Sequence, residues 1–400
     1  MQRNELIALL EDEIVQEFIS LHGSENPEFL ALNYRQRVDF DISKVTQLLQ
    51  LYKKAQHKLP LWILKRCAMN AKNYEQCSSE ETARFKASLF AGKKMLDMTC
   101  GLGVDSYFFS RRFEQVVSLE AHTETFEYAK YNANKLGASN IEFVNENCEN
   151  YELSETYDLI YIDPDRRPEG MQKREYSLQD YSPDMTIFQD TLWPFSEILL
   201  IKVSPMLDIS MILNQLKWVK TIYVVAVKNE VKELLICAKN NFLGDAEIIA
   251  VDIQKEQTSM YSKTASTSKM KYSDAGKYLI EPSKAIIKSG LAANFAMHHS
   301  FGFLAQNGLY FFSDSFDSIP GQCRAFEILH TFVFSWKEIK SFIKKEKIKA
   351  LNIAQRHFFE DVASIRKRLQ IPEGGKNFLF FSKNQAENPV CYYAKPIDLE

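Results

Sequence analysis

The first part of the chain repeats apolar residues at helical spacing. They recur every three or four positions over 5–18 and again over 42–51, a periodicity typical of amphipathic helices. Pro60 stands where a further helix can begin. The pattern predicts a helical domain over residues 1–80.

Short apolar runs then alternate with helical stretches as far as about residue 250. We interpret the runs as strands, at 95–97, 116–120, 141–145, 158–162, 197–203, 221–227 and 234–237. Helical spacing covers 123–136 and 206–215 between them. This alternation predicts an α/β class fold with a Rossmann-like, doubly wound sheet in a domain over 81–254.

The pattern changes again at residue 255. Residues 255–271 are rich in Ser, Thr and Lys and suit either a linker or a strand-and-loop excursion. Over 278–291 the sequence predicts the end of a strand and then a helix that begins at a proline and ends at Gly290. A further strand is predicted over 309–313. A β-α-β-α-β unit follows within 320–400, at 325–329, 335–345, 351–354, 359–369 and 378–382.

Composition narrows the class of protein. The 400 residues are 46% hydrophobic and 12% aromatic, which is ample for packed cores. No run of 18 apolar residues exists, and no apolar signal region follows the first residues, so we expect a soluble, cytoplasmic protein with no membrane partner. The seven cysteines form no CxxC pair, which favours free thiols over disulfides or a metal site.

Charge is distributed unevenly along the chain. Residues 255–400 contain 21 Lys and Arg against 14 Asp and Glu, a local balance of +7, whereas the whole chain carries −3. The first 254 residues are therefore acidic, at −10. A basic segment can attract polyphosphate, although an ordinary solvated face explains the same charge.

A glycine-rich turn follows the first strand of the α/β domain. Asp97 ends the strand, and Gly101 and Gly103 stand in the turn. A dinucleotide fingerprint needs a third glycine three residues later, where this chain has Ser106. A dehydrogenase is therefore disfavoured.

Three more sequence features follow the turn, one after each of the next three predicted strands. Glu120 closes the second strand, where such folds place a carboxylate for ribose hydroxyls. Asn147 and Cys148 follow the third strand, and Asp163-Pro164 follows the fourth, at the strand ends where open α/β sheets bind ligands. The four features together resemble the class I S-adenosylmethionine (SAM) methyltransferases.

The resemblance implies SAM as the cofactor and assigns residues to it. Asp97 would hold the amino group of the methionine moiety, and Glu120 would accept from both ribose hydroxyls. Asn147, where the family more often has Asp, would border the adenine with Cys148. The predicted cofactor-binding residues are Asp97, Thr99, Gly101, Gly103, Asp105, Glu120, Ala121, Asn147 and Cys148.

A helix is predicted over 82–89, directly ahead of the glycine turn. In class I methyltransferases this segment often reaches the methionine end of SAM, which makes Ser78, Ser79 and Thr82 candidate contacts for its carboxylate. A helix N-cap is the alternative, and we favour it for Ser78.

The resemblance extends over nearly the whole chain. The segment 281–291, the loop 163–167 and the C-terminal unit are similar to a bacterial family of SAM-dependent methyltransferases with a ferredoxin-like insert and a THUMP-like C-terminal domain. The implied division places a linker and ferredoxin-like segment at 255–319 and the THUMP-like domain at 320–400. THUMP domains of related enzymes bind structured RNA, so the family implies an RNA substrate; the oligomeric state is open, and a monomer is compatible with the sequence.

Asp163, Pro164 and Arg166 are the predicted catalytic residues. Many amino-methylating enzymes place an acid or amide, two prolines and an aromatic residue here, and the aromatic stacks on a flipped base. This chain has Asp165 and Arg166 in the last two positions. Transfer to an rRNA or tRNA base nitrogen then needs a stacking ring from elsewhere, and the candidates are Tyr161, Tyr176 and Tyr181.

Other roles remain open or are excluded at this loop. Arg166 and Arg167 suit phosphate or carboxylate forks, or a pairing with Asp165 or Glu169 that fixes the loop. Uracil C5 methylation needs a cysteine nucleophile after the fifth strand, where this chain reads Lys202-Val-Ser-Pro205, and we exclude it. The alternatives to an RNA methyltransferase are a methyltransferase for a protein or small metabolite, and a non-catalytic RNA-binding scaffold.

Overall fold

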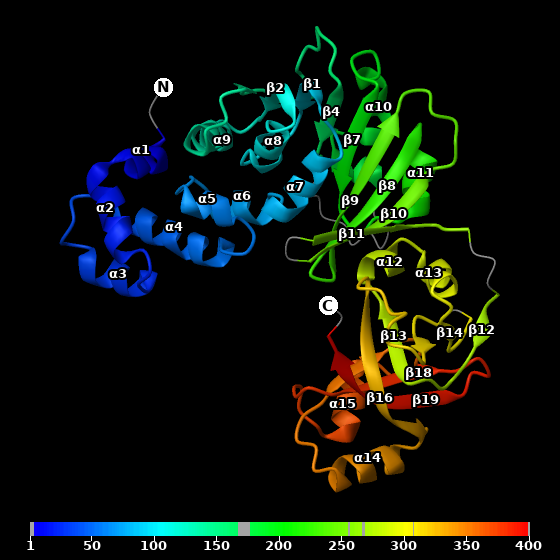
Figure 1. Cartoon of the computed structure of the whole chain (residues 1–400). Helices are drawn as coiled ribbons and strands as arrows, with labels where there is room; N and C mark the ends of the chain where they lie inside the picture. The colour runs from blue at the N-terminus through cyan, green and yellow to red at the C-terminus, as the bar shows by residue number, and fades with distance from the viewer. Residues whose placement is uncertain (1–3, 167–176, 255–256, 266–268, 307, 399–400) are drawn as a thin grey trace. The chain divides into compact units, whose positions relative to one another are not determined.

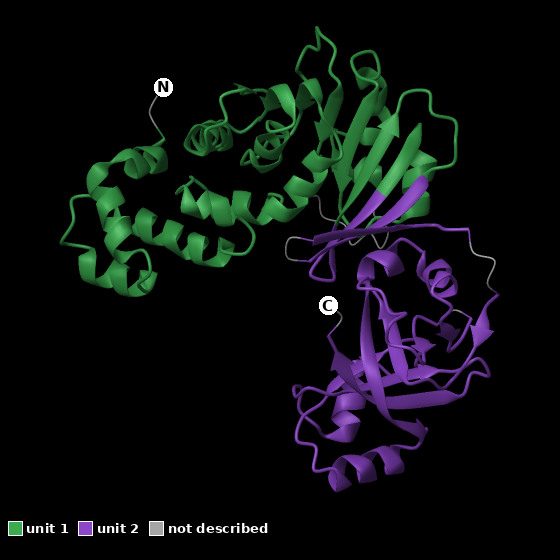
Figure 2. Ribbon diagram, in the orientation of Figure 1, with its two compact units in different colours: residues 1–222, 233–246 green, residues 223–232, 247–400 purple. Residues whose placement is uncertain are grey.

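The chain forms two compact units. The structure is a computed structural model that describes residues 4–166, 177–254, 257–265, 269–306 and 308–398 (Figure 1). Unit 1 comprises 1–222 and 233–246, and unit 2 comprises 223–232 and 247–400 (Figure 2). The four-part division at 80, 254 and 319 stays a prediction.

Helices occupy the beginning of unit 1, which confirms the helical prediction for this region. They are α1 (Glu5–Glu11), α2 (Glu13–His22), α3 (Pro27–Tyr34), α4 (Ile42–Ala55), α5 (Pro60–Leu64), α6 (Ala71–Gln76) and α7 (Glu80–Ser88). Asn4, Asp12 and Asp41 each accept first-turn N–H groups at a helix start, which satisfies donors that have no partner within the helix.

Parallel strands form the centre of unit 1. They are β1 (Gly92–Asp97), β2 (Phe113–Leu119), β3 (Ile141–Val144), β4 (Leu159–Ile162) and β7 (Ile198–Val203). Their order is β3-β2-β1-β4-β7, and β9 (Glu230–Lys239) pairs antiparallel with β7. The chain runs outward from β1 to β3 and then returns to β4 on the other side of β1. Ligands bind at such a switch point, beyond the carboxyl ends of the strands.

Helices cover both faces of these strands, as the doubly wound prediction requires. Figure 1 shows α8 (Val104–Phe109) and α9 (Thr123–Leu136) on one face and α10 (Met185–Leu192) and α11 (Ile209–Gln215) on the other. Because both faces are covered, the central strands are buried: every residue of β4 is buried, whereas the edge strand β3 has no fully buried residue. The fold is thus an α/β doubly wound sheet.

The structure corrects the end of this region. The run 234–237 is the middle of the ten-residue β9 and is not the last strand, since β10 (Glu247–Gln254) and β11 (Gln257–Ser262) follow. These two strands pair antiparallel, with Ile249 opposite Ser262. The strand β11 lies within the polar segment 255–271. Its residues are mostly polar because all of them except Tyr261 and Ser262 are exposed.

Unit 2 contains a second sheet of eight strands. They are β12 (Lys271–Tyr272), β13 (Tyr278–Pro282), β14 (Gly302–Phe303), β15 (Phe311–Ser313), β16 (Cys323–Val333), β17 (Asn352–Gln355), β18 (Phe378–Lys383) and β19 (Pro389–Ile397). The order is β12-β14-β15-β13-β16-β19-β18-β17. Strands from both sides of the predicted boundary at 319 therefore belong to one sheet.

The predicted C-terminal unit is present with local corrections. Helix α14 (Trp336–Lys345) matches, but α15 (Val362–Leu369) begins three residues later than predicted because Asp361 caps it by accepting the Ser364 N–H. The prediction missed β19, which pairs with both β16 and β18. A buried cluster that includes Ile339 and Ile365 packs the two helices on the sheet.

The segment 278–291 also departs from its prediction at the helix start. Ser283 caps α12 (Lys284–Lys288), whereas Pro282 is the last residue of β13. α13 (Ala292–His298) follows directly after Gly290. In the described part of the chain, no helix is both long and apolar enough to cross a membrane.

Candidate functional site

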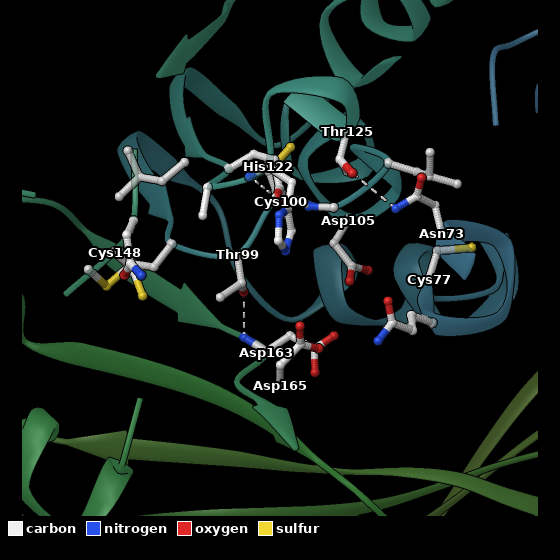
Figure 3. A pocket seen from close by; sticks show the side chains of 18 of the residues that line it. Asn73, Cys77, Thr99, Cys100, Asp105, His122, Thr125, Cys148, Asp163 and Asp165 are labelled. Atoms are coloured by element: carbon white, nitrogen blue, oxygen red, sulfur yellow. Dashed lines mark hydrogen bonds between the residues drawn. The ribbon is translucent and has the colours of Figure 1, made fainter. Parts of the chain in front are cut away.

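A cavity of about 360 Å³ opens at the carboxyl ends of β1, β2 and β4 in unit 1. That volume lies within the range of small-molecule sites. Residues from α6, the glycine turn and the loops after β2, β3 and β4 line it (Figure 3). Figure 3 shows Cys148 on one side of the cavity and Asp105 with Cys77 on the other, so the predicted adenine and methionine ends lie apart.

The glycine turn approaches the cavity with its backbone. Gly101 lines the cavity at a φ of 55°, and a Cβ added there would meet no atom within 4 Å, so it would occupy cavity space. Gly103 has a φ of 77° and precedes the first residue of α8. Left-handed backbone at both positions suits glycine. The backbone of Gly101 is open to the cavity, so a ligand can approach it closely.

Glu120 lies at the rim of the cavity, directly after β2. One carboxylate oxygen accepts the Gly101 N–H at 2.9 Å, and the other accepts the His122 N–H at 2.8 Å. These bonds hold the carboxylate facing the turn. Each oxygen keeps a free lone pair for a hydroxyl donor, which fits the ribose role that the sequence predicts.

The predicted site residues fall into three groups. Those that line the cavity are Thr99, Gly101, Asp105, Glu120, Ala121, Asn147, Cys148 and Asp163. Asp97, Gly103 and Pro164 do not line it. Arg166 belongs to the two-residue strand β5 (Asp165–Arg166), its side chain lies outside the described residues, and Arg167, Glu169 and Tyr176 lie outside them entirely.

Asp97 is buried beneath the turn and is fully shielded from solvent. Its carboxylate accepts the Thr99 N–H at 3.1 Å and the Ser106 hydroxyl at 2.6 Å. Burial raises its pKa to about 7, and the two hydrogen bonds oppose this only in part. Its position suggests that it shapes the turn, and direct contact with a cofactor amine stays a prediction.

Asp163 is tied to the turn and to β7. Its backbone N–H donates to the Thr99 hydroxyl at 2.7 Å, and its carboxylate forms an ion pair with the Lys202 ammonium. Burial raises the pKa of Asp163 although Lys202 lowers it. For Lys202, burial lowers the pKa, but Asp163, Glu233 and Asp105 raise it more, so this side chain stays an ammonium.

A buried charge network extends behind Asp163, and the sequence reasoning missed it. Lys86 of α7 contacts Asp105 at 3.0 Å and Glu233 of β9 at 3.2 Å, and it donates to the Ser78 hydroxyl at 2.7 Å. Ser78 and Tyr161 in turn donate to Asp105 at 2.7 and 2.8 Å. One signal was present in the sequence, because Lys202 interrupts an otherwise apolar strand.

The structure corrects the serine assignment ahead of α7. Ser79 caps the helix by accepting the Thr82 N–H at 3.1 Å, and Ser78 belongs to the charge network at the cavity wall. The predicted helix over 82–89 is α7, which begins two residues earlier. Ser78 is therefore the better placed of the two for a ligand.

Two of the three tyrosines considered as stacking platforms, Tyr161 and Tyr181, do not face the cavity, and Tyr176 lies outside the described residues. Tyr161 is 0% exposed and Tyr181 is 4% exposed, and neither is among the lining residues. Among the described lining residues, the His122 imidazole is the one aromatic ring. Burial raises the thiol pKa of Cys77, Cys100 and Cys148, to about 12 in Cys148, so these lining thiols are not activated nucleophiles.

All seven cysteines are free, as predicted. Across the described residues, no cluster of His, Cys, Asp or Glu has the arrangement of a metal site.

Comparison with known proteins relates both units to described families. Residues 89–197 match the model of a methyltransferase domain, and residues 323–396 match that of a THUMP domain-like family. An uncharacterized SAM-dependent methyltransferase of Mycobacterium tuberculosis is 23% identical over 304 residues, which cover 74% of this chain and 79% of the relative. The match thus spans most of both proteins.

Two further comparisons bear on fold and substrate. The crystal structure of a candidate methyltransferase from Porphyromonas gingivalis W83 superposes with a TM-score of 0.82 at 24% identity, covering 100% of both chains, which shows a shared fold. The 23S rRNA (uracil(747)-C(5))-methyltransferase RlmC of Vibrio vulnificus is 30% identical over 109 residues, or 27% of this chain and 29% of RlmC. The chain therefore contains a methyltransferase domain and, near its C-terminal end, a THUMP-like domain, and it is similar to S-adenosylmethionine-dependent methyltransferases.

Proposed function

We propose that this chain methylates RNA, using SAM held in the unit 1 cavity. The observation that carries the cofactor assignment is the pairing of Glu120 with the Gly101 N–H at the open face of the turn. Glu120 would bind the ribose hydroxyls, and Asn147 and Cys148 would border the adenine. SAM supplies a methyl group on a sulfonium leaving group, so the protein mainly binds, orients and excludes water.

The methionine end of the cofactor would lie toward Thr99, Asp105 and Ser78. These three residues line the cavity, and Figure 3 shows Asp105 on the side away from Cys148. The Asp105 carboxylate can accept from the cofactor ammonium, and the Ser78 hydroxyl lies beside two lysines that favour a carboxylate. The cavity thus provides partners of suitable charge for both groups of an amino acid.

RNA as the substrate class is supported by unit 2 and by one relative. A groove of about 510 Å³ in unit 2 is lined by four lysines around an apolar floor. We call it the lysine groove; its lysines are Lys340, Lys344, Lys347 and Lys349. Clustered lysines bind phosphates by releasing counterions, and RlmC, which matches part of this chain, is an rRNA enzyme.

The acceptor atom is less well defined than the substrate class. The base nitrogen predicted from the sequence would donate an amine N–H to Asp163. It has no stacking ring among the described lining residues except His122. Transfer to a base nitrogen therefore stays a prediction of the sequence analysis.

Calorimetry tests the cofactor assignment. We expect the folded wild-type protein to bind SAM and S-adenosylhomocysteine (SAH) with one site per chain. Wild-type protein that binds neither would overturn the proposal.

Salt-dependent RNA binding tests the substrate class. A Lys344→Glu, Lys347→Glu double variant should bind RNA more weakly and lower the slope of log affinity against log salt by about 2. Lys376→Glu is the matched control, because Lys376 is an exposed unit 2 lysine outside the groove. Equal RNA affinity in all three proteins would exclude the lysine groove as the docking surface.

A further inference from the structure

Five charged side chains from five segments of unit 1 meet at one end of the cavity. They are Lys86 of α7, Asp105 of α8, Asp163 after β4, Lys202 of β7 and Glu233 of β9. Their side chains become more exposed toward the cavity: Lys86 is 0% exposed, Lys202 13% and Asp163 30%. Asp163 lines the cavity, and its carboxylate is paired with Lys202, so a substrate group that reaches Asp163 lies close to both charges.

This pair combines a proton acceptor with a fixed positive charge. Burial raises the pKa of Asp163, which makes its carboxylate a stronger base than an exposed one. Lys202 stays charged because Asp163, Glu233 and Asp105 surround it. A reacting group at Asp163 would thus meet a base and a cation together.

Acceptor atoms differ in their need for such a pair. An exocyclic amine is held by hydrogen-bond acceptors and by stacking of its base on an aromatic ring, and the described lining offers only the His122 ring. A hydroxyl oxygen is a weak nucleophile while it keeps its proton, so it gains from a base that takes the proton and a cation beside the developing charge. The geometry fits the hydroxyl.

We propose that the methyl acceptor is the ribose 2′-hydroxyl of RNA, with Asp163 and Lys202 as the catalytic residues. This inference rests on the proposed function, which it narrows to one acceptor atom. A hydroxyl lone pair forms the O–C bond to the methyl group while the C–S bond breaks and its electron pair stays on sulfur. The hydroxyl proton passes to an Asp163 carboxylate oxygen, and Lys202 stabilises the partial negative charge on the attacking oxygen.

Lys86 and Glu233 act through their neighbours and are positioning residues. Lys86 joins Asp105, Glu233 and Ser78 in one network, and Ser78 also accepts from Lys202 at 3.4 Å. One Glu233 carboxylate oxygen is buried without a hydrogen-bond partner among the described residues. Its charge favours the ammonium form of Lys202.

Mass spectrometry of nucleosides identifies the acceptor. RNA from cells that lack the gene should be incubated with the purified protein and SAM, digested and compared with untreated RNA. We expect a 2′-O-methylnucleoside and a phosphodiester bond that resists alkaline cleavage. A methyl group on a base nitrogen or carbon would overturn the inference and leave the proposed function intact, whereas a protein that binds no SAH would fail at the proposed function itself.

Substitutions test the two catalytic residues. Asp163→Asn and Lys202→Met should each lower kcat on the order of 10³-fold, while the SAH affinity measured by calorimetry changes no more than about threefold (about 0.6 kcal/mol). Lys202→Arg should recover part of the loss because it keeps the positive charge. Lys217→Met is the matched control, because the Lys217–Asp190 ion pair lies at the surface of unit 1.

Two results would overturn the roles of these residues. One is a folded Asp163→Asn or Lys202→Met protein, judged by normal SAH binding, that keeps wild-type kcat. The other is undiminished methylation of an RNA whose target nucleotide carries a 2′-deoxyribose.

Discussion

Asp97 and Asp105 lie at the two ends of the glycine turn, and both are buried, yet their carboxyl pKa values move in opposite directions. Burial raises the pKa of Asp97 to about 7, with two hydrogen bonds in partial opposition. Burial acts in the same sense on Asp105, but the ammonium groups of Lys86 and Lys202 outweigh it and lower the pKa. One buried acid of the turn thus has no cation beside it, whereas the other belongs to a network of paired charges.

The contrast separates two tasks within one cavity. At the cofactor end, backbone N–H groups and one rim carboxylate, Glu120, provide shape and hydrogen bonds. At the proposed acceptor end, Asp163 and Lys202 provide charges of both signs, and electrostatic stabilisation contributes most to catalysis where charge develops. Substitutions should therefore affect the two ends differently.

The largest expected effect is at Lys86. Lys86→Met removes the cation from two buried carboxylates, and the free energy of unfolding should fall by about 5 kcal/mol, the upper end for breaking a buried pair. Because Lys86 is the first of the two cations that lower the pKa of Asp105, this pKa should rise in the folded variant. The loss should therefore be larger at pH 8 than at pH 5, as denaturant unfolding can measure.

A surface ion pair provides the control for Lys86. Lys217→Met should cost no more than about 1 kcal/mol, because its pair with Asp190 is half exposed. An equally small loss in Lys86→Met would contradict the role of Lys86 in lowering the pKa of Asp105.

Asp97 should produce the next largest effect, through pH. Its folded pKa of about 7 lies above the unfolded value, so the folded state holds a proton that the unfolded chain releases. Stability contributed by the neutral acid is complete below pH 4 and is lost as pH rises to about 7, by up to about 4 kcal/mol. Unfolding of ligand-free wild type and Asp97→Asn, compared from pH 4 to pH 8, should show this slope in wild type alone; parallel curves would show that Asp97 titrates normally.

Glu120 should affect binding more than stability. Glu120→Ala would remove the two charge-assisted hydrogen bonds proposed to the ribose hydroxyls, and the SAH dissociation constant should rise about 10- to 100-fold. Calorimetry measures it. Glu114→Ala is the control, because Glu114 is exposed on β2, the strand that Glu120 follows. Equal SAH affinity in the two variants would show that Glu120 does not bind the cofactor.

The smallest expected effect is at Gly103. Its φ of 77° disfavours any residue with a Cβ, while the nearest atom to that Cβ, on Ala129, is at an ordinary 3.5 Å. Gly103→Ala should lower the free energy of unfolding by about 1 to 2 kcal/mol. Thermal unfolding checks this, and an unchanged melting temperature would mean that the turn can relax without glycine.

Local patterns accounted for most of the elements in both units. The periodicity of 123–136 predicted α9 at its observed bounds, which Gly137 ends at a φ of 70°. The strand β11 was ambiguous because an exposed strand lacks the apolar residues that mark buried ones. β19 was missed although its centre is buried, because its pairing on both sides involves residues distant in sequence.

In the candidate site, too, the features set by local sequence were predicted and the contacts between distant residues were not. Motif spacing placed Glu120, Asn147 and Asp163 near the glycine turn, because the ends of parallel strands meet at one edge of a sheet. It could not show that Asp97 lies under the turn and outside the cavity lining. It also could not pair Ser78 with Asp105, since the two are 27 residues apart and meet only when α7 packs beside α8.

The sequence by itself determined the fold class, the methyltransferase domain and the cofactor, because strand periodicity, turn glycines and strand-end acids are local features of fixed spacing. Only the tertiary structure decided which charges are paired. Lys86, Lys202 and Glu233 are far apart in the chain, and their ionisation depends on distance and burial, which no local pattern encodes. The proposed choice of acceptor atom depends on that pairing.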